Sequence, residues 1–275
     1  MKKKAEQGSS VSSMVWLTSQ SLPTLVLGCI AIAALVAVVS RFALRALIPE
    51  SEREGVNSIA APLMPALGAA FAILVAITLA NEAGYLTSAQ GIVSIEAGDA
   101  SRLAWASTTP RVEGAAIQRD LGRYLVATRR YEWHGSNAGS GNDSATGAAL
   151  AALERAVRRQ AVRPALGTPT STELLNSVGA LSNDRRARLA AASKQLPSLY
   201  VITLALSAIA LIANATALTI RSRTRSAFLI WGLVSVIGLS MGLLFALGTP
   251  WRGPITVSGL PLDNVVRDLA SGYFG

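Results

Sequence analysis

Residues 197–220, PSLYVITLALSAIALIANATALTI, form a run of 24 residues without an Asp, Glu, Lys, Arg or His. After six residues, a second such run follows at 227–248, AFLIWGLVSVIGLSMGLLFALG. A helix needs only about 20 apolar residues to cross a bilayer, and a backbone in hydrocarbon must satisfy its own hydrogen bonds. This part of the sequence therefore predicts a pair of membrane-spanning helices joined by a short turn.

A second pair of apolar runs, Val15–Ser40 and Ser58–Ala80, lies near the start of the chain. The four runs are 22 to 26 residues long, and none contains a charged residue or a histidine. Buried helices of soluble proteins are interrupted by polar residues far more often. We therefore expect an integral membrane protein with four spans. The first run is longer than a signal-peptide core and lacks a clear cleavage site, so it is expected to be a retained anchor, whether Met1 or Met14 is the true start.

The composition indicates a substantial aqueous part beside the spans. Hydrophobic residues make up 51% of the chain and charged residues 15%, with a net charge of +9. The basic residues flank the spans or alternate with acidic ones, so a nucleic-acid partner is not expected. The expected domains are a polar tail at 1–14, a first helix pair at 15–80, a helical aqueous domain at 81–196, a second helix pair at 197–248 and a tail at 249–275.

The aqueous domain has the pattern of four helices. They are expected at Gln90–Ser107, Val112–Trp133, Gly147–Val162 and Thr170–Lys194. The second carries apolar residues at helical spacing on one face: Ile117, Leu121, Tyr124, Leu125, Thr128 and Tyr131. The linker Gly135–Gly147, rich in Gly, Ser and Asn, is expected to be a mobile loop. Since no alternating strand pattern occurs, the predicted fold class is all-α.

The chain lacks the usual components of an active site. Its one histidine, His134, adjoins the glycine-rich linker, and its one cysteine, Cys29, lies in the middle of the first span. No Walker-type loop or HExxH motif is present, and the acidic residues of the aqueous domain alternate with arginines. We therefore predict no enzymatic activity, no catalytic residue, no cofactor and no metal site, with the acidic residues in solvated faces or structural ion pairs.

The spans contain small and weakly polar residues but no charged ones, which argues against a proton-coupled transporter. Small residues allow helices to approach closely, and Gly238 and Gly242 are predicted to lie at a helix–helix contact. Lining of a pore by some of the small residues is the alternative.

Several separated stretches also resemble a known family. They are, in chain order, Glu96-Ala97 with Leu103, residues 119–125 (RDLGRYL), Glu132-Trp133, residues 183–189 (NDRRARL) with Leu196-Pro197, and residues 250–258 (PWRGPITVS) with Pro261-Leu262. In their order and their spacing relative to the spans, these stretches resemble the bacterial bestrophin-like domain family of four-span membrane proteins. The resemblance covers residues 58–270.

The resemblance implies a distant similarity to bestrophins, which are pentameric anion channels with a helical cytosolic part between the second and third spans. It implies a homo-oligomer in a bacterial plasma membrane that conducts small anions. By location on the second span, Phe71, Leu74 and Ile77 are candidates for pore lining or a gate. The arginines at the span ends would attract anions or bind lipid phosphates: Arg41, Arg221, Arg223 and Arg225.

Another class of function is a non-conducting scaffold or sensor whose aqueous helices bind a partner protein. Tyr124 and Trp133 would then belong to the contact surface. The side of the membrane that the aqueous domain faces stays open. Short segments near the spans carry five basic residues on one side and six on the other, so the positive-inside rule does not decide. The resemblance favours a cytosolic domain, and the arginine-bearing loops favour the opposite side.

Overall fold

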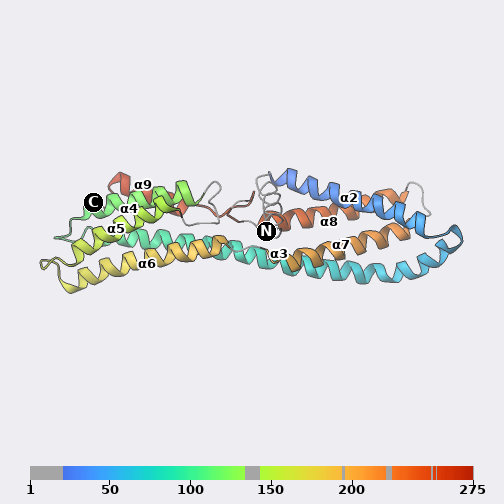
Figure 1. Ribbon diagram of the computed structural model, residues 1–275, viewed down its shortest axis with the longest axis horizontal. Coiled ribbons are helices and arrows are strands. Elements are labelled where there is room, and N and C mark those ends of the chain that lie inside the picture. The colour runs from blue at the N-terminus through green and yellow to red at the C-terminus, as the bar shows by residue number, and fades with distance from the viewer. Residues whose placement is uncertain are drawn as a thin grey trace, which may run out of the picture. The chain divides into compact units, whose positions relative to one another are not determined.

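The computed structural model describes residues 21–133, 143–193, 196–220, 225–248, 250–251 and 253–274, and within these ranges the chain is helical without strands. It divides into two compact units. Unit 1 comprises residues 1–84, 195–249 and 253–255, and unit 2 comprises residues 85–194, 250–252 and 256–275. The all-α prediction is confirmed for the described residues (Figure 1).

Unit 1 is built from α2 (Leu22–Leu47), the first part of α3 (Arg53–Ala106), α7 (Ser198–Leu218) and α8 (Arg225–Leu247), with a short turn η1 (Glu50–Glu52) before α3. α2 packs against both α8 and α7. The core consists of alanines, one phenylalanine and branched aliphatic side chains: Ala33, Ala37, Phe71, Leu204, Ala208, Leu211, Ile212, Val234, Ile237 and Leu244. By length and composition, α2, α3, the stretch that ends in α7, and α8 could each cross a membrane, which confirms four long apolar helices.

The α3 helix corrects one prediction. The sequence pattern separates a span at Ser58–Ala80 from an aqueous helix at Gln90–Ser107, but a single helix of 54 residues contains both. The intervening segment, residues 81–89 (NEAGYLTSA), has no proline and only one glycine, so little in it interrupts a helix. At 1.5 Å per residue, α3 is about 80 Å long, well over twice the thickness of the hydrocarbon core.

The α2 helix also differs from its predicted range of Val15–Ser40. Residues 15–20 lie outside the described part of the chain, and the helix continues past Arg41 and Arg45 to Leu47. It ends because Pro49 disfavours helical geometry at the preceding residue, and Ile48 is indeed extended (φ −107°, ψ 112°). The arginine at position 41 thus lies within a helix, not in the loop after it.

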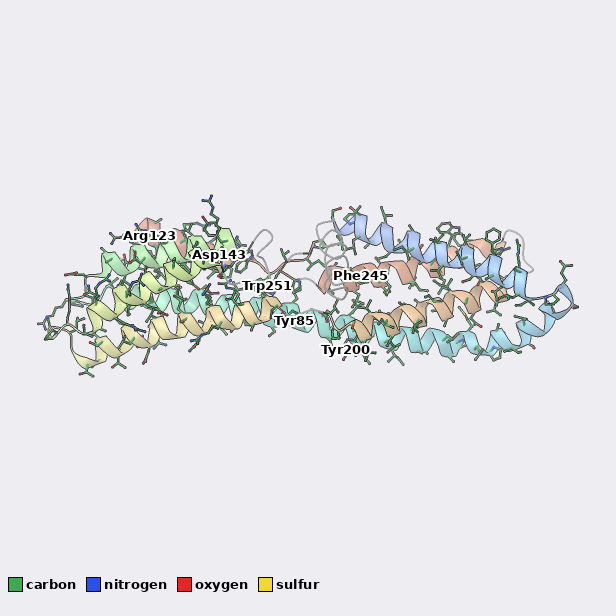
Figure 2. All side chains as sticks on the ribbon, in the orientation of Figure 1. Tyr85, Arg123, Asp143, Tyr200, Phe245 and Trp251 are labelled. Atoms are coloured by element: carbon green, nitrogen blue, oxygen red, sulfur yellow. The ribbon has the colours of Figure 1, made fainter. Side chains whose placement is uncertain are left out.

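Unit 2 contains the second part of α3 together with α4 (Gly114–Ala127), a π-helical turn η2 (Thr128–Glu132), α5 (Ser144–Ala161), α6 (Thr168–Ser193) and α9 (Leu260–Ser271). α5 packs against α4 and α6, and α9 packs against α4. The Tyr85 hydroxyl of α3, labelled in Figure 2, donates a hydrogen bond to the Ala191 carbonyl of α6. Residues of α3, α4, α5, α6 and α9 form one hydrophobic core in this unit.

The first turn of α5 lies where the sequence suggests a loop. Asp143 caps the helix, since its Oδ1 accepts hydrogen bonds from the backbone N–H groups of Ala145 (2.8 Å) and Thr146 (3.1 Å). Residues 144–147, predicted as part of the linker, are therefore helical. The rest of the linker, and His134 beside it, lies outside the described residues.

The α9 helix was not predicted from the sequence, which suggests only a C-terminal tail. Pro261 lies in its first turn, and Gly272, with a left-handed φ of 73°, ends it. Leu262 and Val265 are buried against the rest of unit 2. Proline near the start and glycine at the end are standard signals of helix limits, so this helix was detectable in the sequence.

Candidate functional site

The pore-lining candidates on α3 do not share one face of the helix. Phe71 is only 5% exposed and lies in the core of unit 1, and Leu74 is partly buried against the same core. Ile77 is 56% exposed. At about 100° per residue, Leu74 lies between Phe71 and Ile77 around the helix axis, and Ile77 lies about 120° away from Phe71, outside the core. The structure therefore separates Ile77 from Phe71 and Leu74.

Ile77 belongs instead to an apolar face of α3 that is exposed on unit 1. Its larger members are Ile59, Leu63, Ile73 and Ile77. Between them lie exposed small residues and a proline: Pro62, Ala66, Ala69, Ala70, Ala76 and Ala80. We call these ten residues the outer face of α3. It carries no charged side chain, so it suits contact with lipid tails, with another helix or with a narrow pore.

Contacts between helices place four helix ends of unit 1 together. Asn214 near the end of α7 donates to the Ala60 carbonyl near the start of α3 (3.0 Å). Gly238 and Gly242 of α8 face Ile30 and Val26 of α2, in that order, so the two helices are antiparallel. The end of α2, the start of α3, the end of α7 and the start of α8 therefore lie at one end of unit 1 (Figure 1).

One of the four predicted mouth arginines, Arg41, is described in full and lies at this end of unit 1. Arg41 is half-buried in the last turns of α2, and Arg45 is exposed in its final turn. Arg221 and Arg223 lie outside the described residues, and Arg225 is described only as the first residue of α8. In the sequence, the connections from α2 to α3 (residues 41–56) and from α7 to α8 (residues 221–226) together contain six arginines against three glutamates. We call these two segments the arginine-bearing connections.

The two glycines singled out for packing lie at the contact between α8 and α2. A Cβ atom at Gly238 would come within 2.6 Å of the Ile30 Cα, and one at Gly242 within 2.8 Å of a Val26 methyl group. Such distances are shorter than any van der Waals contact. Close approach of the two backbones here therefore requires residues without side chains.

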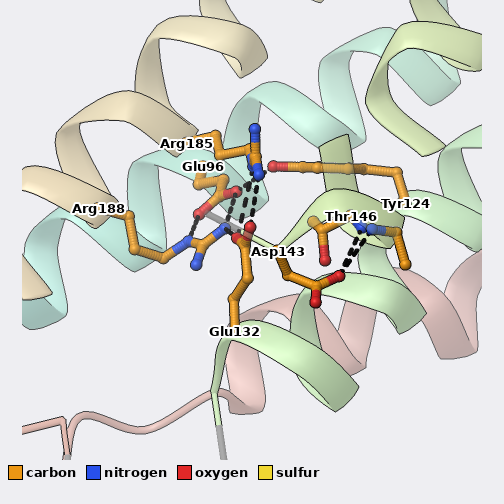
Figure 3. Close-up of polar contacts among 8 residues, drawn as sticks. Glu96, Tyr124, Glu132, Asp143, Thr146, Arg185 and Arg188 are labelled. Carbon is orange, nitrogen blue, oxygen red and sulfur yellow. Dashed lines mark hydrogen bonds and ion pairs between the residues drawn. The ribbon is translucent and has the colours of Figure 1, made fainter. Parts of the chain in front are cut away.

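A buried cluster of charged residues joins α3, α4, η2 and α6 of unit 2 (Figure 3). Arg188 of α6 donates from Nε to Glu96 Oε2 of α3 (2.6 Å) and from Nη2 to Glu132 Oε2 of η2 (2.9 Å). Arg185, one turn earlier, binds the other Glu132 oxygen at 2.5 Å. The Tyr124 hydroxyl of α4 donates to Glu96 Oε1 at 2.6 Å. Two carboxylates and two guanidinium groups thus neutralise one another in a nearly solvent-free interior.

The π-helical turn explains why a glutamate reaches this cluster. α-Helical spacing from Ile117 onward predicts that Tyr131 lies on the buried face, but Tyr131 is exposed and Glu132 is buried. A π-turn accommodates an extra residue, so later side chains lag in their rotation around the axis. Glu132 consequently faces inward toward Arg185 and Arg188, and Tyr131 faces outward.

The surroundings of Tyr124 and Arg188 in the cluster shift the pKa values of both side chains. Burial and the neighbouring Glu96 charge raise the pKa of Tyr124 well above its ordinary value, so the hydroxyl stays a hydrogen-bond donor. For Arg188, burial by itself would lower the pKa, but Glu96, Tyr124 and Glu132 more than compensate and the pKa is raised. Arg188 therefore stays charged and Tyr124 stays a donor across the physiological pH range.

Tyr124 and Trp133, predicted as a partner-contact surface, are buried in unit 2. Tyr124 bonds to Glu96, and the Trp133 ring contacts the guanidinium of Arg129, 4.8 Å from its centroid, and the Trp251 ring, at 5.3 Å. A partner protein could not reach these side chains without opening the unit. The two residues belong to the core, and their burial corrects the surface interpretation.

The C-terminal segment is fastened to unit 2 by polar contacts. Arg129 binds both carboxylate oxygens of Asp263 on α9, at 2.8 and 3.0 Å, and its guanidinium packs against Gly259 where a Cβ would collide. The Gln90 side chain accepts from the Ser258 N–H (2.8 Å) and donates to the Ser258 carbonyl (3.2 Å). Arg129 and Gln90 thereby hold the C-terminal segment against η2 and α3. Neither residue is predicted from the sequence to have this role.

The buried cluster suits a structural role more than a chemical one. Its charges balance, and the carboxylates of Glu96 and Glu132 are already occupied by donors. Among the described residues, no group of three or more His, Cys, Asp or Glu side chains could hold a metal ion. The arrangement holds α3, α4, η2 and α6 in a fixed relation, and it gathers most of the stretches that carry the family resemblance.

The chain matches a known protein family. The family model described as Bestrophin-like domain matches residues 31–262 of the chain. Searches of curated proteins and of solved structures give no match. The matched range includes α3 with its outer face, both arginine-bearing connections and the buried cluster of unit 2.

Proposed function

Since the chain belongs to the Bestrophin-like domain family, as its match over residues 31–262 shows, we propose that it is an oligomeric membrane protein that conducts small anions passively. The family and the four apolar helices indicate a membrane protein. The observation that supports conduction best is the outer face of α3, which is exposed, uncharged and rich in small residues over the length of a membrane span.

The outer face of α3 would line the pore when several copies assemble around an axis. Alanines allow the helices to approach one another, and Ile73 and Ile77 would then form apolar rings one turn apart. Apolar constrictions of this kind gate channels by excluding water. Ile73 and Ile77 thus take the gate role first assigned by location to Phe71, Leu74 and Ile77, because the first two pack inside unit 1.

The excess of arginines at one end of unit 1 supports a preference for anions. Positive charge at a pore mouth raises the local anion concentration and opposes cations. Some of these arginines would also bind the phosphates of membrane lipids, which anchors the helix ends. A bacterial plasma membrane is the proposed location, since the sequence resembles the bacterial bestrophin-like domain family.

Planar bilayers containing the purified full-length protein test this proposal. Under a chloride gradient, we expect a current whose reversal potential shifts from zero toward the equilibrium potential of chloride. We also expect an oligomer in mass photometry. The variant Ile77→Ala should raise the conductance several-fold because it widens the apolar ring, whereas Ile209→Ala, at an exposed position on α7, should leave it unchanged. A monomer without conductance would refute the proposal.

A further inference from the structure

Three successive polar pairs join α3 to α6 in unit 2. At the buried end, Arg188 binds Glu96, and both side chains are at most 1% exposed. At the exposed end, Arg102 binds both carboxylate oxygens of Glu173, at 2.6 and 3.1 Å. The α3 members of the series, residues 96, 99 and 102, follow one another at intervals of three along one side of the helix. The outer two pairs each join opposite charges.

The middle pair consists of two acids. Asp99 of α3 and Asp184 of α6 are half-buried, and each lies one turn along its helix from a member of the Arg188–Glu96 pair, so the antiparallel register brings their carboxyl groups toward each other. The Asp184 Oδ2 atom is buried and receives no hydrogen bond from an N–H or hydroxyl donor. Two ionised carboxylates cannot hydrogen-bond, because neither carries a hydrogen. A contact of this kind is satisfied only when one carboxyl is protonated.

The nearby cations form their ion pairs with other acids, although the exposed Arg102 also interacts with the Asp99 charge. Arg102 binds Glu173, and Arg185 and Arg188 bind Glu132 and Glu96. Glu96, the next charge on α3, adds to the repulsion on Asp184. The other packed elements add no free charge to the contact. Tyr124 of α4 bonds to Glu96, and Glu132 of η2 bonds to Arg185 and Arg188. The arginines of α5 are exposed: Arg155, Arg158 and Arg159.

We propose that Asp99 and Asp184 share one proton, and that release of this proton to solvent loosens α3 against α6. In the protonated state, the Asp184 carboxyl donates a hydrogen bond to Asp99, and the pair joins the two helices as its neighbours do. In the deprotonated state, two adjacent negative charges repel each other across the same contact. The pair is thus a pH-sensitive clamp within unit 2.

The pH range of the clamp follows from the environment of Asp184. Burial, the contact with Asp99 and the charges of Asp99 and Glu96 raise the pKa of Asp184 from 3.8 to about 7. Between these values the folded chain holds a proton that the unfolded chain has released, so stability falls as the pH rises. Below this range the contribution is fully present, and above about pH 7 it has been lost.

Infrared spectroscopy of the full-length protein in detergent tests the proton directly. As the pH rises from about 5 to about 9, we expect the carbonyl band of one protonated carboxyl per chain to disappear around neutral pH. Both Asp184→Asn and Asp99→Asn should remove this transition. The matched control is Glu173→Gln, which breaks the exposed pair between the same helices. Hydrogen bonds from Arg102 lower the pKa of Glu173, so Glu173 is already ionised near neutral pH and contributes nothing to the transition there. The Glu173→Gln variant should therefore keep the transition.

Hydrogen exchange followed by mass spectrometry tests the loosening, independently of conduction. After correction for the intrinsic pH dependence, residues 92–106 and 177–190 of the native protein should exchange faster above neutral pH than below it. In Asp184→Asn this difference should vanish. An unchanged exchange pattern or a native protein without the infrared transition would overturn the proposal. So would loss of the transition on addition of magnesium or sodium ions alone, because a bound cation would then replace the proton.

Discussion

Arg188 is the residue on which the charge balance of the buried cluster depends, since it binds both Glu96 and Glu132. Replacing it by alanine leaves two buried carboxylates without their shared cation. We expect Arg188→Ala to lower the free energy of unfolding by about 3–5 kcal/mol, measured by denaturant titration of the purified protein. The exposed Arg186, which bonds only within its own helix, is the matched control, and Arg186→Ala should change stability by less than about 0.5 kcal/mol. Equal effects of the two substitutions would contradict a central role for the cluster.

At the residue scale, the sequence identified many participants but not their partners. The stretches that carry the family resemblance contain Glu96, Tyr124, Glu132 and Arg188. Alternation of charge correctly suggested structural ion pairs among the acidic residues. The pairing of Arg188 with Glu96, however, joins residues 92 positions apart and depends on tertiary packing. The same limit explains why Tyr124 and Trp133 were assigned to a surface, since amphipathic spacing does not reveal what covers a helix face.

The contact between α8 and α2 is the element whose geometry is most sensitive to a single methyl group. Gly238→Ala would place a Cβ 2.6 Å from the Ile30 backbone, so one helix must move away from the other. We expect the melting temperature in detergent to fall by several degrees. Gly232 lies on the same helix with open space at its Cβ position, so Gly232→Ala should cause no loss. A similar fall for both variants would show that the glycines serve helix flexibility and not close packing.

At the element scale, hydrophobic runs predicted the apolar helices well but their limits poorly. The continuity of α3 was missed because the change from apolar to polar composition near Ala80 resembles a boundary, although nothing there breaks a helix. The π-turn η2 was missed because no simple sequence signal distinguishes it from an α-helical turn. The α9 helix was missed although its proline and glycine marked both ends, so better use of the capping residues would have found it.

At the scale of the whole molecule, composition and run length were sufficient for the membrane class and the all-α fold. They could not give the orientation, because basic residues are nearly balanced between the two sets of flanking segments. They also could not show that the helix ends joined by the arginine-bearing connections lie at the same end of unit 1. That arrangement depends on the antiparallel contact of α2 with α8 and on the bond from Asn214 to Ala60.

Conduction requires that unit 1 crosses the bilayer four times, and cysteine labelling tests this most directly. Cys29 lies half-buried in α2, so cysteines introduced at two polar segments outside the described residues, Ser140→Cys and Thr224→Cys, serve as the reporters. One apolar helix, α7, separates the two sites along the chain. We predict that a membrane-impermeant maleimide labels only one of them in intact cells and labels both once the membranes are opened. Reaction of the residue-224 site alone would place unit 2 in the cytosol. Labelling of both sites in intact cells would contradict the four-span arrangement.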